Sequence, residues 1–100
     1  MRKGKMVKKI DKIIDSIVPI LARNNARRAA LFGSVISDNF DEQSDVDILV
    51  ELDDSLSLLD YIGIIIELED KLGRKVDLVE YDTIKPALKD EIERSALRIL

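Results

Sequence analysis

Two aspartates separated by one residue are the strongest candidates for chemistry in this sequence. They open the run 45–52, Asp-Val-Asp-Ile-Leu-Val-Glu-Leu, whose alternation predicts a β-strand. Side chains two residues apart on a strand point the same way, so Asp45 and Asp47 would share one face. Val46, Ile48 and the alternate apolar residues that follow them would face the core. Two bare carboxylates about 4 Å apart repel by on the order of 4 kcal/mol near a protein surface, so we expect a cation beside them. Mg²⁺ suits carboxylate oxygens and substrate phosphates.

A third carboxylate stands in a second predicted strand. Residues 75–80, Lys-Val-Asp-Leu-Val-Glu, also alternate, and Asp77 is their central acid. If this strand pairs beside 45–52, three carboxylates could hold two metal ions, which would clamp the attacking and leaving oxygens of a phosphoryl-type displacement.

A glycine and a serine supply the other half of the predicted site. Gly33-Ser34 follows Arg28-Ala29-Ala30-Leu31-Phe32, which reads as a short strand. Glycine lets the backbone approach a phosphate closely, and amides at the start of a helical turn favour an anion. Alone, Gly-Ser is usually a turn and Asp-x-Asp usually a solvated strand edge. Their combination predicts a nucleoside triphosphate site.

The composition excludes several other kinds of chemistry. The 100 residues include neither Cys nor His, which removes disulfides, Cys/His zinc sites, catalytic thiols and Ser-His-Asp triads. A calcium-loop pattern beginning at Asp41 fails, because Val46 stands where Gly is required and Leu52 where Glu is required.

Charge is distributed unevenly along the chain. Residues 1–28 carry nine bases and two acids, residues 29–70 carry twelve acids and no base, and the net charge is -4. The acidic stretch calls for a cation or a partner. Nucleic-acid binding through the basic first segment is not favoured, since that segment lacks interleaved aromatic residues. We see no signal peptide and no apolar run long enough to cross a membrane, so we expect a cytoplasmic protein.

The predicted elements give one small domain over residues 1–100. Helical spacing predicts a helix over 6–24, with Pro19 kinking it or starting a second segment, and a turn follows at Asn24-Asn25. A second helix over 57–72 would begin at Ser55 or Ser57 and end before Gly73. A last helix would open at Pro86 and carry Leu88, Ile92 and Leu97. With strands at 28–32, 45–52 and 75–80, this order predicts a two-layer α/β domain on a small sheet.

The joint spacing resembles a known signature. Gly33-Ser34, ten intervening residues and Asp45-Val46-Asp47, followed by Ile-Leu-Val-Glu, are similar to the DNA polymerase β-like nucleotidyltransferase superfamily. The length and element order resemble its small branch, the minimal nucleotidyltransferases or MNT domains. The resemblance implies an α+β fold with a small mixed sheet and flanking helices.

The same resemblance implies roles for the residues. Asp45 and Asp47 would hold Mg²⁺, in a site of two ions, and Asp77 would complete it and help activate the acceptor hydroxyl. Gly33 and Ser34 would contact the triphosphate of ATP. The expected reaction transfers AMP to a tyrosine of a HEPN-domain toxin, with this protein as the antitoxin.

One departure from the signature keeps a second function class open. Ser37 and Asp38 stand where many members have Arg and Gly, which removes a cation near the triphosphate. The alternative is therefore a noncatalytic module that neutralises its partner by contact alone. Transfer to a small molecule ranks lower, because a chain this short lacks a second domain to enclose one. The acceptor should arrive on another macromolecule. For the chain itself we expect a homodimer or a hetero-oligomer.

Overall fold

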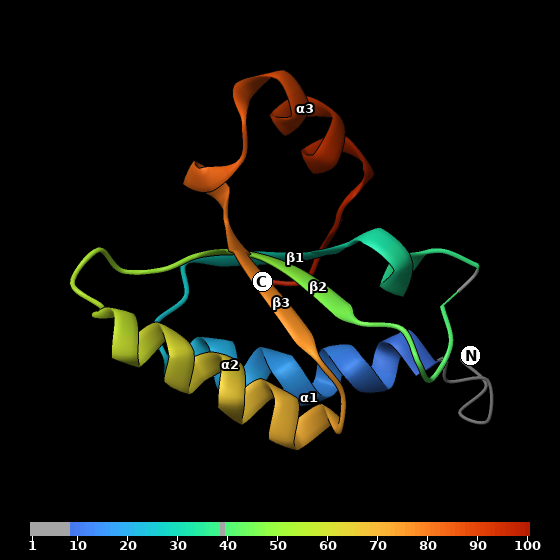
Figure 1. Ribbon diagram of the computed structural model, residues 1–100, viewed down its shortest axis with the longest axis horizontal. Helices are drawn as coiled ribbons and strands as arrows, with labels where there is room; N and C mark the ends of the chain where they lie inside the picture. The colour runs from blue at the N-terminus through green and yellow to red at the C-terminus, as the bar shows by residue number, and fades with distance from the viewer. Residues whose placement is uncertain (1–8, 39) are drawn as a thin grey trace, which may run out of the picture.

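The computed structural model describes residues 9–38 and 40–100. Figure 1 shows the arrangement of the helices and strands. The helices are α1 (Lys9–Arg23), α2 (Leu58–Leu72) and α3 (Pro86–Ser95), with short 3-10 turns η2 (Gly33–Ile36) and η3 (Tyr81–Thr83). The strands are β1 (Arg28–Phe32), β2 (Val46–Glu51), β3 (Val76–Glu80) and β4 (Leu97–Arg98).

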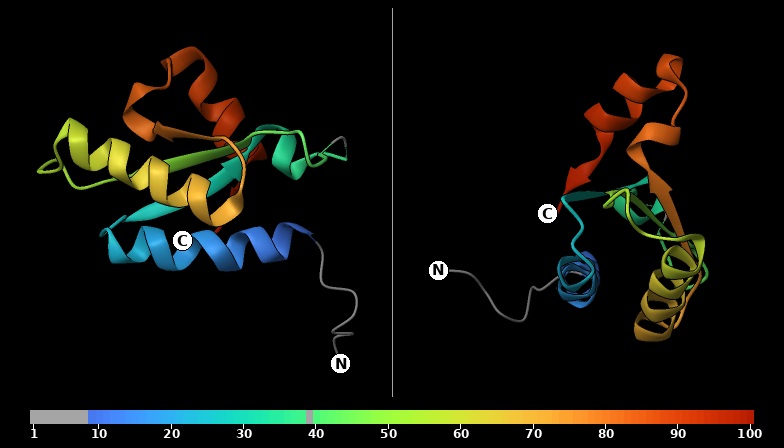
Figure 2. Two further views of the ribbon diagram at one scale, coloured as in Figure 1. Left: turned by 60° about the horizontal axis from the view of Figure 1, so that its bottom comes forward. Right: turned by 90° about the vertical axis from the view of Figure 1, so that its left-hand side faces the viewer.

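The four strands form one mixed sheet in the order β3-β2-β1-β4. β1 runs antiparallel to both β2 and β4, whereas β2 and β3 are parallel. Helices α1 and α2 lie side by side against one face, and α3 stands over the other face (Figures 1 and 2). None of the described helices is long and apolar enough to cross a membrane.

Strand alternation divides the side chains between the two faces as predicted. Val46, Ile48, Val50 and Leu52 join the main core beneath the sheet, which includes Ile17 of α1 and other helix residues. On the opposite face, Leu49 packs with Ala30 and Tyr81, and Ile92 and Ala96 at α3 close this smaller cluster. The acids of β2 are therefore kept on the face away from α1 and α2.

The predicted limits of the second helix are confirmed. Ser57, rather than Ser55, caps α2: its side chain accepts from the Asp60 amide, and Asp60 accepts from the Ser57 amide in return. Gly73 follows the last residue with a left-handed φ of 68°.

Two predictions near the other helices were wrong. No second segment starts at Pro19: helix α1 continues through it, because Ile17, Ile20 and Leu21 on both sides of the proline are buried in the core and hold the helix in place. Helix α3 ends at Ser95, so Leu97 belongs to β4, where it pairs with Leu31. A two-residue strand is too short to show alternation in a sequence. Residues 6–8 of the first predicted helix fall outside the described residues.

Candidate active site

Asp47 and Asp77 lie side by side on neighbouring strands. β2 and β3 are parallel and pair these two residues in register, so both side chains leave the sheet on the same face. Both residues are half-buried. The predicted pairing of the strands 45–52 and 75–80 is thus confirmed, and it brings two of the three candidate carboxylates into direct contact.

The surroundings of Asp47 raise its pKa. Burial raises its pKa to about 6, and the hydrogen bond with Asp77 and the negative charges of Asp77 and Asp45 add to the shift. Every one of these influences acts in the same direction, so no Lys or Arg among the described residues offsets them. A bound cation would reverse this balance, and two hard carboxylate oxygens side by side suit a divalent one.

Asp45 occupies the position just before β2. It acts on Asp47 through its charge, while Asp47 and Asp77 form the close pair. Among the described residues, no group of three acidic side chains is placed so that it could hold a metal ion. The pair is therefore the centre of the candidate metal site, and Asp45 lies beside it.

Gly33 brings the backbone against this pair. Its neighbour Phe32 pairs with Asp47 across β1 and β2, and Gly33 itself has a φ of +74°. A Cβ at this position would collide with Asp47 Oδ2 and lie 3.3 Å from Asp47 Cγ. Only glycine combines this φ with such a close approach.

Ser34 lies beside Asp45. Its hydroxyl is 3.4 Å from the Asp45 carbonyl oxygen, to which it donates a long hydrogen bond. Buried Val35 fixes η2 in the main core. The structure therefore places Gly33 and Ser34 next to the aspartates, as the sequence predicts. The departing residues Ser37 and Asp38 follow η2 and are exposed, and Ser37 Oγ donates to the Ser34 carbonyl at 2.9 Å.

Arg74 holds the loop before Asp45, a role that the sequence did not predict. Its guanidinium donates to the carbonyl oxygens of Asp41 and Ser44, both at 2.9 Å, and lies over the Phe40 ring with a centroid distance of 4.7 Å. The loop that it holds leads directly into Asp45. No short-range pattern links an arginine to a loop thirty residues earlier.

Two residues of α2 hold the strand that carries Asp77. The Tyr61 hydroxyl donates to the Leu78 carbonyl, and Glu69 accepts from the Val76 amide at 3.0 Å. Val76 and Leu78 are the two neighbours of Asp77 in β3, which is an outer strand of the sheet. Burial, Glu80 and Asp77 raise the pKa of Tyr61, which keeps the hydroxyl protonated as this hydrogen bond requires. Neither residue was predicted, because both read only as members of an amphipathic helix.

An open cavity of about 550 Å³ adjoins the pair. Its lining includes Asp47, Asp77, Phe32 and Val79 of the sheet, together with Tyr61 and Ile65 of α2. The cavity is open to solvent, which suits a site completed by another molecule.

Known proteins resemble this chain in sequence and in fold. A family model described as polymerase beta, nucleotidyltransferase, matches residues 15–100. Protein adenylyltransferase MntA of Thermococcus cleftensis is 41% identical over 76 residues, covering 76% of this chain and 73% of the relative. The protein MJ0435 of Methanocaldococcus jannaschii, provisionally named a protein adenylyltransferase, is 43% identical over 91 residues, which are 91% of this chain and 98% of the relative.

Solved structures agree with the family match. One solved as a minimal nucleotidyltransferase has a TM-score of 0.77 and 29% identity, covering 92% of this chain and 97% of that one. A toxin-antitoxin structure with AMP-PNP has a TM-score of 0.74 at 24% identity, covering 87% of this chain and 72% of that one, and supports the fold alone. Together with the acid pair beside Gly33 and Ser34, these matches establish that the chain belongs to the polymerase β nucleotidyltransferase family.

Proposed function

We propose that the protein is a magnesium-dependent nucleotidyltransferase that transfers AMP from ATP to a tyrosine hydroxyl of a HEPN-domain toxin, and so acts as its antitoxin. One observation carries the proposal: Asp47 and Asp77 share a register on parallel strands, and the backbone of Gly33 packs directly against Asp47. This arrangement supports a cation site beside a phosphate site. The cytoplasm, where ATP is supplied, is the proposed compartment.

Each predicted residue has a role in this reaction. Asp45, Asp47 and Asp77 would hold Mg²⁺, which neutralises the triphosphate and the charge that develops during transfer. Gly33 and Ser34 would hold the β and γ phosphates through backbone amides and the serine hydroxyl. Asp77, on the outer strand, would accept the proton of the attacking tyrosine. The tyrosine oxygen then bonds to the α-phosphorus, the bond from that phosphorus to the bridging oxygen breaks, and pyrophosphate leaves.

The relatives support the substrate and the partner. Curated relatives at 41% and 43% identity are named protein adenylyltransferases. One solved neighbour is a toxin-antitoxin with AMP-PNP, and another is a tri-AMPylated HEPN toxin from Shewanella oneidensis in complex with its MNT antitoxin. The open cavity of this chain fits an acceptor carried by a second protein.

Transfer of label from ATP tests the proposal. Purified protein, Mg²⁺, α-labelled ATP and the HEPN protein encoded beside its gene should give label on that partner. Asp47→Asn and Asp77→Asn should lower the rate by on the order of 100-fold or more, as expected when a group that stabilises the transition state is lost. The matched control Asp90→Asn alters an exposed acid of α3 outside the pair and should transfer normally. No label with the wild type, or equal label with Asp47→Asn, would refute the proposal.

The exposed Ser37 and Asp38 favour one alternative, in which the chain neutralises the toxin by contact alone. A survival assay separates the two functions. If contact is sufficient, Asp47→Asn and Asp77→Asn will still protect cells that express the toxin. If AMP transfer is required, both variants will bind the toxin but fail to protect.

A further inference from the structure

Helix α2 exposes a row of large apolar side chains on its outer side. Leu58, Leu59, Ile62 and Ile66 form this row, here called the α2 ridge, and are 73%, 79%, 41% and 52% exposed. The inner side of the same helix buries Ile64 and Leu68 in the core. A helix that needed only its core contacts would carry polar residues outside, so the ridge has the character of an interface.

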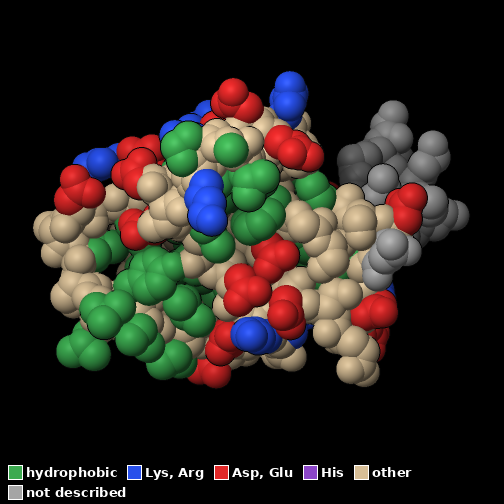
Figure 3. Space-filling model, turned by 45° about the horizontal axis from the view of Figure 1, so that its top comes forward, with side chains coloured by type: hydrophobic (Ala, Val, Ile, Leu, Met, Phe, Trp, Pro, Cys, Tyr) green, Lys and Arg blue, Asp and Glu red, His purple; other side chains and the backbone are tan. Residues whose placement is uncertain are grey.

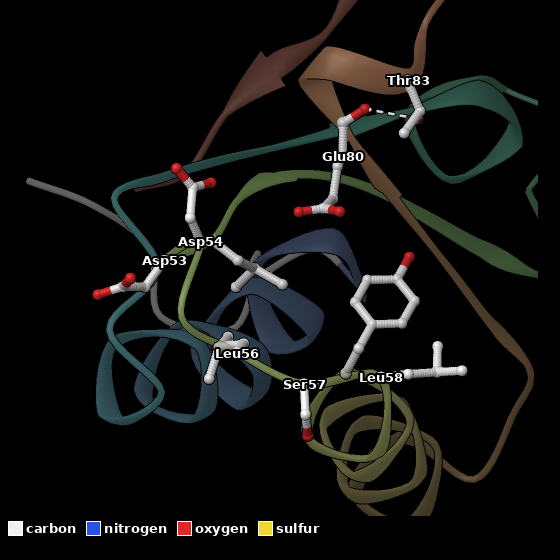
Figure 4. Close-up of a pocket in the computed structure, with 9 residues that line it drawn as sticks. Asp53, Asp54, Leu56, Ser57, Leu58, Glu80 and Thr83 are labelled. Atoms are coloured by element: carbon white, nitrogen blue, oxygen red, sulfur yellow. Dashed lines mark hydrogen bonds between the residues drawn. The ribbon is translucent and has the colours of Figure 1, made fainter.

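An acidic pocket adjoins the start of the ridge. It has a volume of about 430 Å³, and Leu58 and Tyr61 lie on its apolar side. Asp53, Asp54 and Glu80 supply its carboxylates, which Figure 4 shows on the opposite side of the pocket from Leu58. The residues that line it include no Lys or Arg. The lining of this pocket therefore combines apolar side chains with negatively charged ones.

The same surface leads to the candidate active site. Tyr61 lines this pocket and also lines the cavity that holds Asp47 and Asp77. In Figure 3 a broad group of apolar side chains lies on the same face as a central group of acidic ones. A protein seated on the α2 ridge would thus extend to the acid pair around the outer strand β3.

We propose that the α2 ridge and the acidic pocket are the docking surface for the toxin that receives AMP. The toxin would present an apolar helix face flanked by Lys or Arg, which would pair with Asp53, Asp54 and Glu80. This inference rests on the proposed function, because it takes the acceptor to be a protein.

The negative charge of the acidic pocket favours a basic protein partner over a second copy of this chain, a lipid surface or a nucleic acid. In a symmetric contact with a second copy, Asp53, Asp54 and Glu80 of one chain would approach the same acids of the other, which is repulsive. Anionic lipid surfaces and nucleic acids are repelled for the same reason. Nearby Arg27 pairs with Glu51 at 3.5 Å, and its charge also helps to lower the pKa of Asp53. It does not line the pocket, where three carboxylates face no cationic side chain of the lining. A partner with basic residues around an apolar face is complementary.

Single substitutions on the ridge test the proposal with the HEPN protein encoded beside the gene. Leu58→Ser and Leu59→Ser should each weaken binding by about tenfold or more, measured by titration calorimetry. In the transfer reaction they should raise the KM for the toxin and leave kcat at saturating toxin and the affinity for ATP unchanged. Leu88→Ser, at a leucine of α3 that is 49% exposed, is the matched control and should bind as the wild type does.

Charge substitutions provide the second arm. Asp54→Lys should weaken toxin binding and reduce its dependence on salt, whereas Glu91→Lys, at an exposed acid of α3, should change neither. Both substituted residues are exposed, so folding is not at risk.

The outcomes separate this proposal from the proposed function. If ridge variants bind and transfer like the wild type, the docking proposal is wrong while the transfer reaction stands. If the toxin binds and the ridge variants release it, but no AMP is transferred, the docking proposal stands and the proposed function fails. Docking is also overturned if the wild type does not bind the toxin, or if Leu58→Ser converts a dimer of this chain to monomers.

Discussion

Gly33 lies so close to Asp47 that one added carbon would collide with the carboxylate. The closeness follows from the antiparallel pairing of Phe32 with Asp47, after which the chain turns at Gly33 with a φ of +74°. The backbone at the start of η2 therefore lies directly against the Asp47 carboxylate. The proposed phosphate site and the proposed metal site are therefore one packed unit.

This relationship makes Gly33→Ala more damaging than an ordinary glycine substitution. A left-handed φ costs about 1 kcal/mol for a residue with a Cβ, and the collision adds displacement of Asp47. We expect a loss of stability greater than that strain alone, together with weaker binding of Mn²⁺ as a probe of the site. Urea unfolding and Mn²⁺ titration measure the two effects.

Two other glycines provide matched controls. Gly73 has a φ of +68° with nothing near its missing Cβ, so Gly73→Ala should show the strain without the collision. Gly63 lies within α2 in open space, and Gly63→Ala should stabilise the protein by roughly 0.5–1 kcal/mol. If Gly33→Ala is no more destabilising than Gly73→Ala and binds Mn²⁺ normally, the close approach has no consequence.

Local patterns were enough to predict most of the fold. The alternation of 45–52 gave the strand and its two faces, and Ser57 and Gly73 gave the limits of α2, because capping and period depend on residues close in sequence. The spacing of Gly33, Ser34, Asp45 and Asp47 gave the candidate site for a similar reason: a single antiparallel pair of strands brings them together.

Contacts between distant segments were not predictable in the same way. The pairing of Asp47 with Asp77 depends on the register between β3 and β2, which alternation alone does not determine. The contacts made by Arg74 with the loop at 41–44 and by Tyr61 with β3 join segments that no period connects. Leu97 follows the last helix in sequence, but pairing with Leu31 draws it into the sheet.

The pKa of Asp47 predicts how the stability of the metal-free protein changes with pH. Since this pKa is raised from 3.8 to about 6, the folded state holds the proton more tightly than the unfolded state. The resulting stability is fully present below about pH 4 and is lost as the pH rises through about 6. With allowance for screening by solvent, the loss should be on the order of 1–2 kcal/mol. Urea unfolding between pH 4.5 and 7 in chelator measures it.

Asp47→Asn should remove this pH dependence, and Mg²⁺ at pH 7 should restore stability to the wild type alone. Asp41, Glu51 and Asp53 have lowered pKa values, so their stabilisation is lost only in more acidic solution, below this pH range. Asp54→Asn is the control at an exposed acid and should keep the wild-type profile. An unchanged slope in Asp47→Asn would show that Asp47 is not the group responsible.

Arg74→Lys should loosen the loop that leads into Asp45. A lysine can reach one of the two carbonyls but cannot present the planar guanidinium that holds both Asp41 and Ser44 and stacks on Phe40. We expect faster hydrogen exchange of the amides at 41–44, with exchange in β2 unchanged. Arg94→Lys, on the exposed side of α3, is the control. Equal protection of the loop in Arg74→Lys and wild type would contradict the proposed restraint.

Tyr61→Phe tests whether the hold of α2 on β3 positions Asp77. The substitution keeps the ring and removes only the hydroxyl that donates to Leu78, so we expect a loss of about 1 kcal/mol of stability. If the hydroxyl also positions Asp77, the affinity for Mn²⁺ should fall by on the order of tenfold, as when a ligand loses its supporting contact. Tyr81→Phe is the matched control, since Tyr81 lies beside Arg28 and away from the acid pair and keeps its ring contact with that guanidinium. A variant that loses stability but binds Mn²⁺ like the wild type would show that Tyr61 supports the fold without positioning Asp77, because a purely structural hydroxyl changes the free energy of unfolding and leaves the acid pair as it was.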